Sequence, residues 1–185
     1  MTLLRKKRFY AILFVIGLVI LFMNANAIGR LMYPIHYKEE ILASARTYEV
    51  DPLWITAIIR LESNFRAHTV SNKGATGVMQ IMPDTASWIA EQRPEFSADS
   101  SELLTIPTIN IRMGTWYISY LYRLFKPLFQ ESGLQYREHD QLAVIAASYN
   151  AGQGAVQKWL SSGVWDGTLE SSSNIPYRET RHYVQ

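Results

Sequence analysis

A carboxylate stands on an otherwise apolar helix face in the first third of the chain. Glu62 follows Ile58 and Ile59 by four and three residues, so the three side chains share one face of a helix. An ionised carboxylate on such a face costs free energy, and the group responds with a raised pKa. A carboxyl group with a pKa near neutrality suits general acid catalysis. Glu62 is therefore the candidate catalytic residue.

The competing interpretation of Glu62 is structural. At the edge of an apolar face, its side chain would reach solvent or pair with Arg60 or Arg66. The position favours the functional interpretation, because Glu62 ends the predicted helix and a glycine-containing loop follows it. Residues at the lip between a packed helix and a loop are well placed to meet a ligand.

Two further segments combine glycine with side chains that could contact a ligand. Residues 74–80 read GATGVMQ and residues 148–154 read SYNAGQG. The structural interpretation of the first is a turn packed by apolar side chains, and that of the second is a helix that stops at glycine. Taken singly, each segment fits that structural interpretation better than a functional one.

Composition excludes several other chemistries. The chain has no cysteine, which removes disulfides, Cys-ligated zinc and thiol nucleophiles. Its four histidines, at 36, 68, 139 and 182, form no pair with metal-ligand spacing, although an ion site built from carboxylates alone stays open. We therefore expect no metal and no cofactor. Five of the 18 Lys and Arg residues lie within the first 30 positions and the remaining chain is net acidic, so nucleic-acid binding is not expected.

The elements that must position these residues are helices. Apolar residues recur at helical spacing, no sustained period-2 alternation is present, and no internal repeat or second folded domain is evident. Asp51-Pro52 predicts a helix start, Asp140 predicts another, Pro127 predicts the end of a long helix, and Gly152 predicts a helix stop. The expected helices begin near 37, at 51–52, at 83, near 109, at 140, near 156 and at 175–176, and residues 64–80, 93–107, 130–138 and 161–174 are expected to be loops. The fold class is all-α.

The N-terminus predicts the cellular compartment. Four consecutive cations at 5–8 precede an uncharged apolar run, and residues 9–28 reach roughly the length that spans a bilayer. Positive charge before such a run keeps the N-terminus in the cytoplasm. We expect residues 1–30 to form a single-pass membrane anchor and residues 31–185 an extracytoplasmic domain. The alternative is a secreted protein, since Ala25-Asn26-Ala27 fits a signal cleavage site.

Five segments in order resemble the motifs of one enzyme family. The chain resembles the lytic transglycosylases, in the branch related to the soluble lytic transglycosylase, over about residues 36–185. The matching segments are ES at 62–63, GVMQ at 77–80, NIRMGTWY at 110–117, SYNAG at 148–152 and IPYRETRHYV at 175–184. Val78 and Ser148 stand where the family carries Leu and Ala.

The resemblance implies a lysozyme-like helical domain with a substrate cleft. It implies cleavage of the β-1,4 bond between N-acetylmuramic acid and N-acetylglucosamine in peptidoglycan glycan strands, leaving 1,6-anhydromuramic ends. Glu62 would be the catalytic acid and then the base toward the sugar's own 6-hydroxyl. The implied substrate-binding residues are Ser63, Gly77, Val78, Met79, Gln80, Tyr149, Asn150 and Ala151, with Val78 and Met79 as apolar walls. Tyr117, Glu179 and Arg181 are implied as supporting groups, the last two holding Tyr149 or the helix end.

Two other functions remain open. One is a hydrolytic, lysozyme-type muramidase on the same fold, which would need a second carboxylate such as Glu49, Asp51, Asp84 or Glu179 near Glu62. The other is a non-catalytic, membrane-anchored glycan-binding protein, which has no need of a buried acid. The absence of a second carboxylate in a matching motif favours the transglycosylase.

Overall fold

A computed structural model describes residues 3–24, 29, 34–96, 102–131 and 136–185. The chain divides into two units, Met1–Lys38 and Glu39–Gln185. The first contains helix α1 (Leu3–Met23), with the apolar side chains of Phe9–Met23 largely exposed. None of the described helices meets the length and apolarity required to cross a membrane. The part of the expected membrane segment at residues 25–28 lies outside the described residues.

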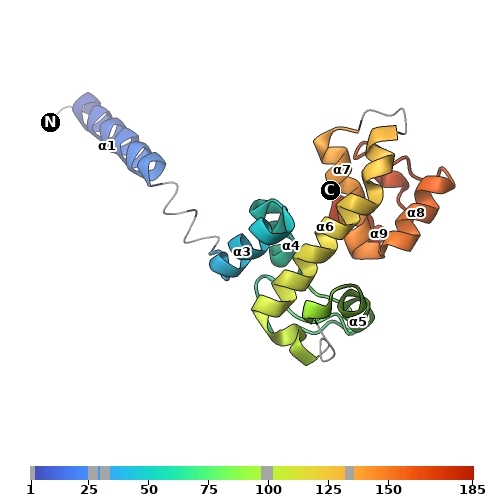
Figure 1. Ribbon diagram of the computed structural model, residues 1–185. Helices are drawn as coiled ribbons and strands as arrows, with labels where there is room; N and C mark the ends of the chain where they lie inside the picture. Colours follow the sequence, from blue (N-terminus) through green and yellow to red (C-terminus); the bar gives the residue numbers. More distant parts are fainter. Residues whose placement is uncertain (1–2, 25–28, 30–33, 97–101, 132–135) are drawn as a thin grey trace. The chain divides into compact units, whose positions relative to one another are not determined.

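The second unit is built from helices (Figure 1). In the described part of the chain no strand forms, and β-type pairing is limited to isolated bridges between Val70 and Thr76 and between Thr76 and Ile81. The prediction of an all-α fold is therefore confirmed. The elements are α3 (Lys38–Tyr48), α4 (Pro52–Ser63), α5 (Pro83–Gln92), α6 (Pro107–Glu131), α7 (Glu138–Ala151), α8 (Gln153–Ser161) and α9 (Arg178–Val184), with short 3-10 turns at Pro94–Phe96, Glu102–Thr105 and Ser172–Asn174.

Helix α7 is the packing centre of the C-terminal half. It contacts α6, α8 and α9, while α5 packs on α6 (Figure 1). Its residues Val144 and Ile145 are fully buried, as are Ile55 and Ile59 of α4 and Met113 of α6. Each such side chain stabilises the fold by about 2 kcal/mol through burial. The core thus fixes the ends of α4 and α7, where the candidate site residues lie.

Helix α4 begins as the sequence predicts. The Asp51 carboxylate accepts a hydrogen bond of 2.7 Å from the Leu53 backbone N–H, and Pro52 occupies the first helical position. At the other end, Asn64 adopts a left-handed conformation with φ 50°, and Phe65 follows with φ 64°. These two residues terminate the helix directly after Glu62-Ser63 and turn the chain into the loop.

The prediction that Pro127 ends the long helix is wrong. Helix α6 continues through Pro127 to Glu131. A proline inside a helix removes one backbone hydrogen bond and crowds the preceding turn. Here the loss falls near the end of the helix, where Phe125 is buried and Phe129 packs edge-on against Tyr136 at 5.6 Å. Aromatic packing of the last turn outweighs the local penalty.

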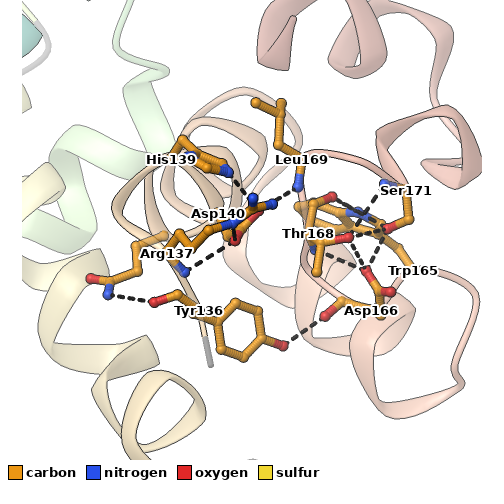
Figure 2. A network of polar contacts seen from close by, with 10 residues as sticks. Tyr136, Arg137, His139, Asp140, Trp165, Asp166, Thr168, Leu169 and Ser171 are labelled. Atoms are coloured by element: carbon orange, nitrogen blue, oxygen red, sulfur yellow. Dashed lines mark hydrogen bonds and ion pairs between the residues drawn. The ribbon is translucent and has the colours of Figure 1, made fainter. Parts of the chain in front are cut away.

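The start of α7 also differs from the prediction. The helix begins at Glu138, and Asp140 is its third residue rather than its cap. Figure 2 shows that the buried Asp140 carboxylate accepts from the backbone N–H of Arg137 at 3.0 Å and from that of Leu169 at 2.9 Å. These bonds hold the pKa of Asp140 below its usual range, against the opposing effect of its burial. Asp140 therefore joins the helix start to the loop before α9 and is structural.

The last helix begins later than expected. Ile175 is fully buried and Pro176 precedes α9, which starts at Arg178 rather than at residues 175–176. The seven residues of α9 pack against α7. This contact brings the C-terminal motif to the site.

Candidate active site

Glu62 is held by a tyrosine from the far end of the chain. The Tyr183 hydroxyl on α9 donates a hydrogen bond of 2.7 Å to Oε1 of Glu62 on α4. The pKa of Glu62 is raised to about 7, chiefly by burial and also by the negative charge of Glu179, while the Tyr183 hydrogen bond acts in the opposite direction. A carboxyl group in this state is protonated in a large fraction of molecules near neutral pH, as a general acid requires.

Tyr149 links Glu62 to an open cleft. Burial raises the pKa of Tyr149, and the charge of Glu62 raises it further. Burial also raises the pKa of Tyr183, with smaller contributions from Glu62 and Tyr149. Tyr183 of α9 thus contacts Glu62 of α4 directly, and Tyr149 of α7 interacts with both groups electrostatically. Tyr149 lines a hollow of about 220 Å³, which we call the central cleft, together with Gln80, Ile81, Met82, Thr85, Tyr117, Asn150, Ala151 and Gly152.

The loop that carries the GVMQ segment is fixed by one buried asparagine of α6. Asn110 donates to the carbonyl oxygens of Thr76 and Leu104, each at 2.9 Å, and accepts from the Met79 N–H at 2.8 Å. Gly77 has φ 87°, and a Cβ at this position would collide with the Asn110 side chain and the Leu104 carbonyl. The glycine is thus required for the loop to lie against α6.

Gly114 serves the same contact on the helix side. A Cβ there would collide with the sulfur and methyl of Met79. The NIRMG segment therefore works as a docking surface: Asn110 bonds the loop backbone and Gly114 leaves room for Met79.

The burial of three residues contradicts the prediction that their side chains contact or orient the substrate. Val78 and Met79 are fully buried, so their side chains pack in the core and form no wall that a sugar could touch. The Ser63 hydroxyl is also buried and donates at 2.8 Å to the Val78 carbonyl rather than orienting Glu62. These residues attach the loop to α4 from behind the cleft. The side chains that line the cleft in their place are the exposed Met82 and the half-buried Thr85.

Gln80 faces the cleft with its carbonyl end available. Its amide nitrogen donates to the carbonyl oxygens of Thr69 at 3.0 Å and of Gly77 at 2.9 Å. Gln80 itself has φ 48°, a left-handed conformation that these two bonds stabilise. Because the loop uses the nitrogen, the side-chain oxygen is the atom left to accept a hydrogen bond from a ligand.

The SYNAG segment lines the cleft with side chains that are themselves positioned. The Tyr149 hydroxyl donates at 2.8 Å to the Met79 carbonyl, and the Asn150 side-chain oxygen accepts at 2.7 Å from the Thr180 hydroxyl. The amide nitrogen of Asn150 is then oriented as a donor. Asn150 and Ala151 also line a second hollow of about 540 Å³ with Lys73 and residues 176–180, so these two residues lie between the two hollows.

The three supporting residues are only partly where the resemblance implies. Tyr117 lines the cleft and packs on Tyr149 with ring centroids 5.7 Å apart. Arg181 donates to the Ile175 and Pro176 carbonyl oxygens and so holds the helix end. Glu179 is an exposed residue whose carboxylate lies 3.6 Å from Lys73 Nζ, so it pairs with Lys73 rather than holding Tyr149. Its influence on the site is electrostatic, through the pKa of Glu62.

The sequence reasoning did not single out three residues that position the site. Tyr183 binds Glu62, Thr180 binds Asn150, and Asn110 binds the Met79 backbone. All three lie inside segments recognised as motifs, at 110–117 and 175–184. Their place inside these motifs could have singled out the three residues, but the sequence does not show which residue each one contacts. Among the described residues, no cluster of three or more His, Asp or Glu side chains is arranged to hold a metal ion.

Comparison with known proteins gives the family. Residues 39–170 match the family described as the transglycosylase SLT domain, and the chain belongs to that family. It is 32% identical over 155 residues to the soluble lytic murein transglycosylase of Escherichia coli. That match includes 83% of this chain and 22% of the relative.

Solved structures agree in fold. The 70 kDa soluble lytic transglycosylase of Escherichia coli superposes with a TM-score of 0.69 at 29% identity, over 84% of this chain and 23% of that one. An inactive glutamate-to-glutamine variant of the lytic transglycosylase Slt from Pseudomonas aeruginosa superposes with a TM-score of 0.67 at 31% identity. This match includes 85% of this chain and 23% of that one. The lysozyme-like helical fold is thereby confirmed. The chain matches less than a quarter of the length of these proteins.

Proposed function

We propose that the chain is a peptidoglycan lytic transglycosylase with Glu62 as its catalytic residue. The observation that carries this proposal is the half-buried Glu62 carboxyl, with a pKa of about 7, held by Tyr183 and clustered with the cleft residue Tyr149. Family membership supports the same substrate class. A relative that is inactive as a glutamate-to-glutamine variant shows that a carboxyl group is essential in that protein, which supports a catalytic role for Glu62.

The proposed reaction uses one carboxyl group twice. Protonated Glu62 gives its proton to the glycosidic oxygen as the bond from that oxygen to the anomeric carbon breaks. The resulting carboxylate then takes the proton of the 6-hydroxyl, whose oxygen bonds to the anomeric carbon and closes the 1,6-anhydro ring. The 6-hydroxyl is tethered to the reacting sugar, so its effective concentration far exceeds that of an unpositioned water. Glu62 ends the cycle protonated.

The cleft residues supply orientation in this scheme. The Asn150 amide nitrogen, aligned by Thr180, donates to an oxygen of the sugar or its acetamido group. The Gln80 oxygen accepts from an acetamido N–H, since the loop uses its nitrogen. Tyr149 and Ala151 give the cleft its wall, and Tyr117 supports Tyr149 from α6.

A hydrolytic alternative rests on Glu179. The negative charge of Glu179 raises the pKa of Glu62, so Glu179 lies near enough to Glu62 to influence it. A muramidase would need it to activate water or to act as a nucleophile. Its exposure and its ion pair with Lys73 favour the transglycosylase, because neither provides a desolvated, positioned base.

Mass spectrometry of the muropeptides released by the full chain separates these reactions. We expect muramic ends that are 1,6-anhydro and resist borohydride reduction. Reducible ends would establish the muramidase. Glycan strands that are bound but not cleaved would establish a binding protein.

We also propose that residues 1–30 direct residues 31–185 out of the cytoplasm and keep them at the membrane. The cations at 5–8 and the exposed apolar side chains of Phe9–Met23 support this proposal. Membrane fractionation and N-terminal sequencing of the chain made in a bacterium test it. An intact N-terminus in the membrane fraction is the expected result, and a mature form that begins at Ile28 would show a cleaved signal instead.

A further inference from the structure

A small hollow lies outside the candidate active site, where the ends of α3 and α5 meet α6. Its volume is about 230 Å³, and we call it the Arg123 hollow. It shares no lining residue with the central cleft or with the hollow formed by residues 176–180. Pockets that bind drug-sized molecules have volumes of roughly 300–1,000 Å³, so this hollow fits one small group rather than a glycan strand.

Charged side chains of both signs line the Arg123 hollow. Glu49 follows the end of α3, Arg93 follows the end of α5, and Arg123 lies on α6. Within the described part of the chain, Glu49 forms no ion pair with either arginine or with another cation. Opposite charges therefore line one hollow without pairing with each other.

The two arginines differ in how far their charge is neutralised. Arg93 pairs with Glu95 through contacts of 2.6 and 2.7 Å to one carboxylate oxygen. Arg123 donates a hydrogen bond of 2.6 Å to the Ser119 hydroxyl, which is neutral, and forms no ion pair with any described acid. Because Ser119 accepts this bond, its own proton is left to be donated. Arg123 and Ser119 thus offer a positive charge and hydrogen-bond donors to a ligand.

Two buried aromatic rings complete the lining. Tyr48 and Trp116 border the hollow and are largely withdrawn from solvent. Trp116 also stacks on Tyr120 with ring centroids 5.6 Å apart, so its ring is fixed. Charges beside such a low-polarity surface interact more strongly than charges that water surrounds.

The charges of the hollow select a ligand that carries both signs. Arg123 attracts a simple anion but Glu49 repels it, and a simple cation meets the reverse. An α-amino-acid centre, with an ammonium and a carboxylate on one carbon, can pair with both residues together. Peptide stems of peptidoglycan carry such a centre wherever the second amino group of their diamino acid is not cross-linked.

We propose that the Arg123 hollow binds a zwitterionic α-amino-acid centre, with its carboxylate on Arg123 and Ser119 and its ammonium on Glu49. Two sources supply this chemistry, namely the free end of a peptide stem and free amino acids. The inference rests on the proposed function for the first source only. It concerns binding outside the cleft and not the reaction.

NMR titration of the full chain, following the indole signal of Trp116, measures binding at the hollow. The first probe is a tripeptide stem that ends in diaminopimelic acid and is blocked at its other end. The second is the same stem with its free amino group acetylated, and the third is free D-alanine. Acetylation should weaken binding about fivefold in the unmodified chain, the size of one exposed charge pair, and should change nothing in Glu49→Gln. Arg123→Gln should weaken both forms of the stem about fivefold.

Lys126→Gln and Glu39→Gln are the matched controls, because both residues are exposed charges, on α6 and α3, outside the hollow. Both variants should bind like the unmodified chain. Tighter binding of the stem than of D-alanine would identify the stem as the source, and equal binding would assign the site to free amino acids.

Two results would overturn the proposal. One is a loss on acetylation that persists in Glu49→Gln, and the other is a Trp116 signal that none of the probes shifts. These titrations involve no cleavage, so their failure is distinct from failure of the proposed reaction. The latter would be seen as reducible muramic ends released by the unmodified chain.

Discussion

The hydroxyl of Tyr183 donates a 2.7 Å hydrogen bond to the carboxyl of Glu62 across a separation of 121 residues. This bond stabilises the ionised carboxylate, while burial and the charge of Glu179 favour the protonated acid. The balance places the pKa of Glu62 at about 7. A residue of the final helix therefore lowers the pKa of a carboxyl group on the second helix of the domain, against the larger effect of burial.

Removing the Tyr183 hydroxyl and removing the Glu179 carboxylate should shift the pH profile of activity in opposite directions. In the unmodified chain, kcat/KM on glycan strands should fall as pH rises through about 7, because the acid must be protonated. Tyr183→Phe removes a bond to the charged form and should move the midpoint to higher pH. Glu179→Gln removes a negative charge and should move it to lower pH.

Glu91→Gln serves as the control for the pH profile, since Glu91 is an exposed acid on α5. The midpoint of the pH profile of Glu91→Gln should equal that of the unmodified chain. Midpoints are compared rather than maximal rates, so a general loss of activity does not confuse the result. Shifts of the same sign in both variants would contradict the assignment of Glu62 as the titrating acid.

Replacing Glu62 should increase stability in a pH-dependent way. The folded-state pKa of about 7 exceeds the ordinary value of 4.5, so stability that is fully present below pH 4.5 is lost as pH rises through 7. Glu62→Gln should therefore be more stable than the parent by on the order of 2–3 kcal/mol at pH 8 and nearly equal to it at pH 4. Urea denaturation at both pH values measures this. A Gln variant that is less stable at pH 8, or that keeps most of the activity, would rule out the buried catalytic acid.

Gly77→Ala should unfold or strongly weaken the loop that carries Gln80. The new methyl group would meet the Asn110 side chain and the Leu104 carbonyl, in addition to the strain of φ 87°. We expect a loss of about 3 kcal/mol or more in the free energy of unfolding. Gly74→Ala isolates the packing effect, because φ is 89° there but no atom lies within 4 Å of the added carbon. Equal losses in the two variants would show that packing on Asn110 is unimportant.

Thr180→Val should reduce catalysis more than stability. The exchange preserves shape but removes the hydroxyl that donates to Asn150, so the Asn150 amide loses its orientation. We expect kcat/KM to fall by about tenfold, with a loss of roughly 1 kcal/mol in unfolding free energy. Thr47→Val, at an exposed hydroxyl that bonds only within α3, should change neither. Unchanged kinetics in Thr180→Val would mean that Asn150 does not contact the substrate.

Features that depend on near neighbours along the chain could be predicted without the structure. Helical spacing predicts the all-α fold, Asp51-Pro52 predicts the start of α4, and Glu62 is identified by its place on the face of Ile58 and Ile59. Such signals are local, because a residue's face and a cap's hydrogen bond are set within one or two helical turns.

The contacts that each of these residues makes could not be predicted, because they depend on how distant segments pack. Pro127 stays inside α6 because aromatic packing at Phe129 outweighs a local penalty. Met79 is a core residue because it packs against Gly114 of α6. The pairing of Glu62 with Tyr183 joins segments with no common local pattern. Side-chain burial and hydrogen bonding over such separations depend on how helices pack, and packing is a property of the whole chain.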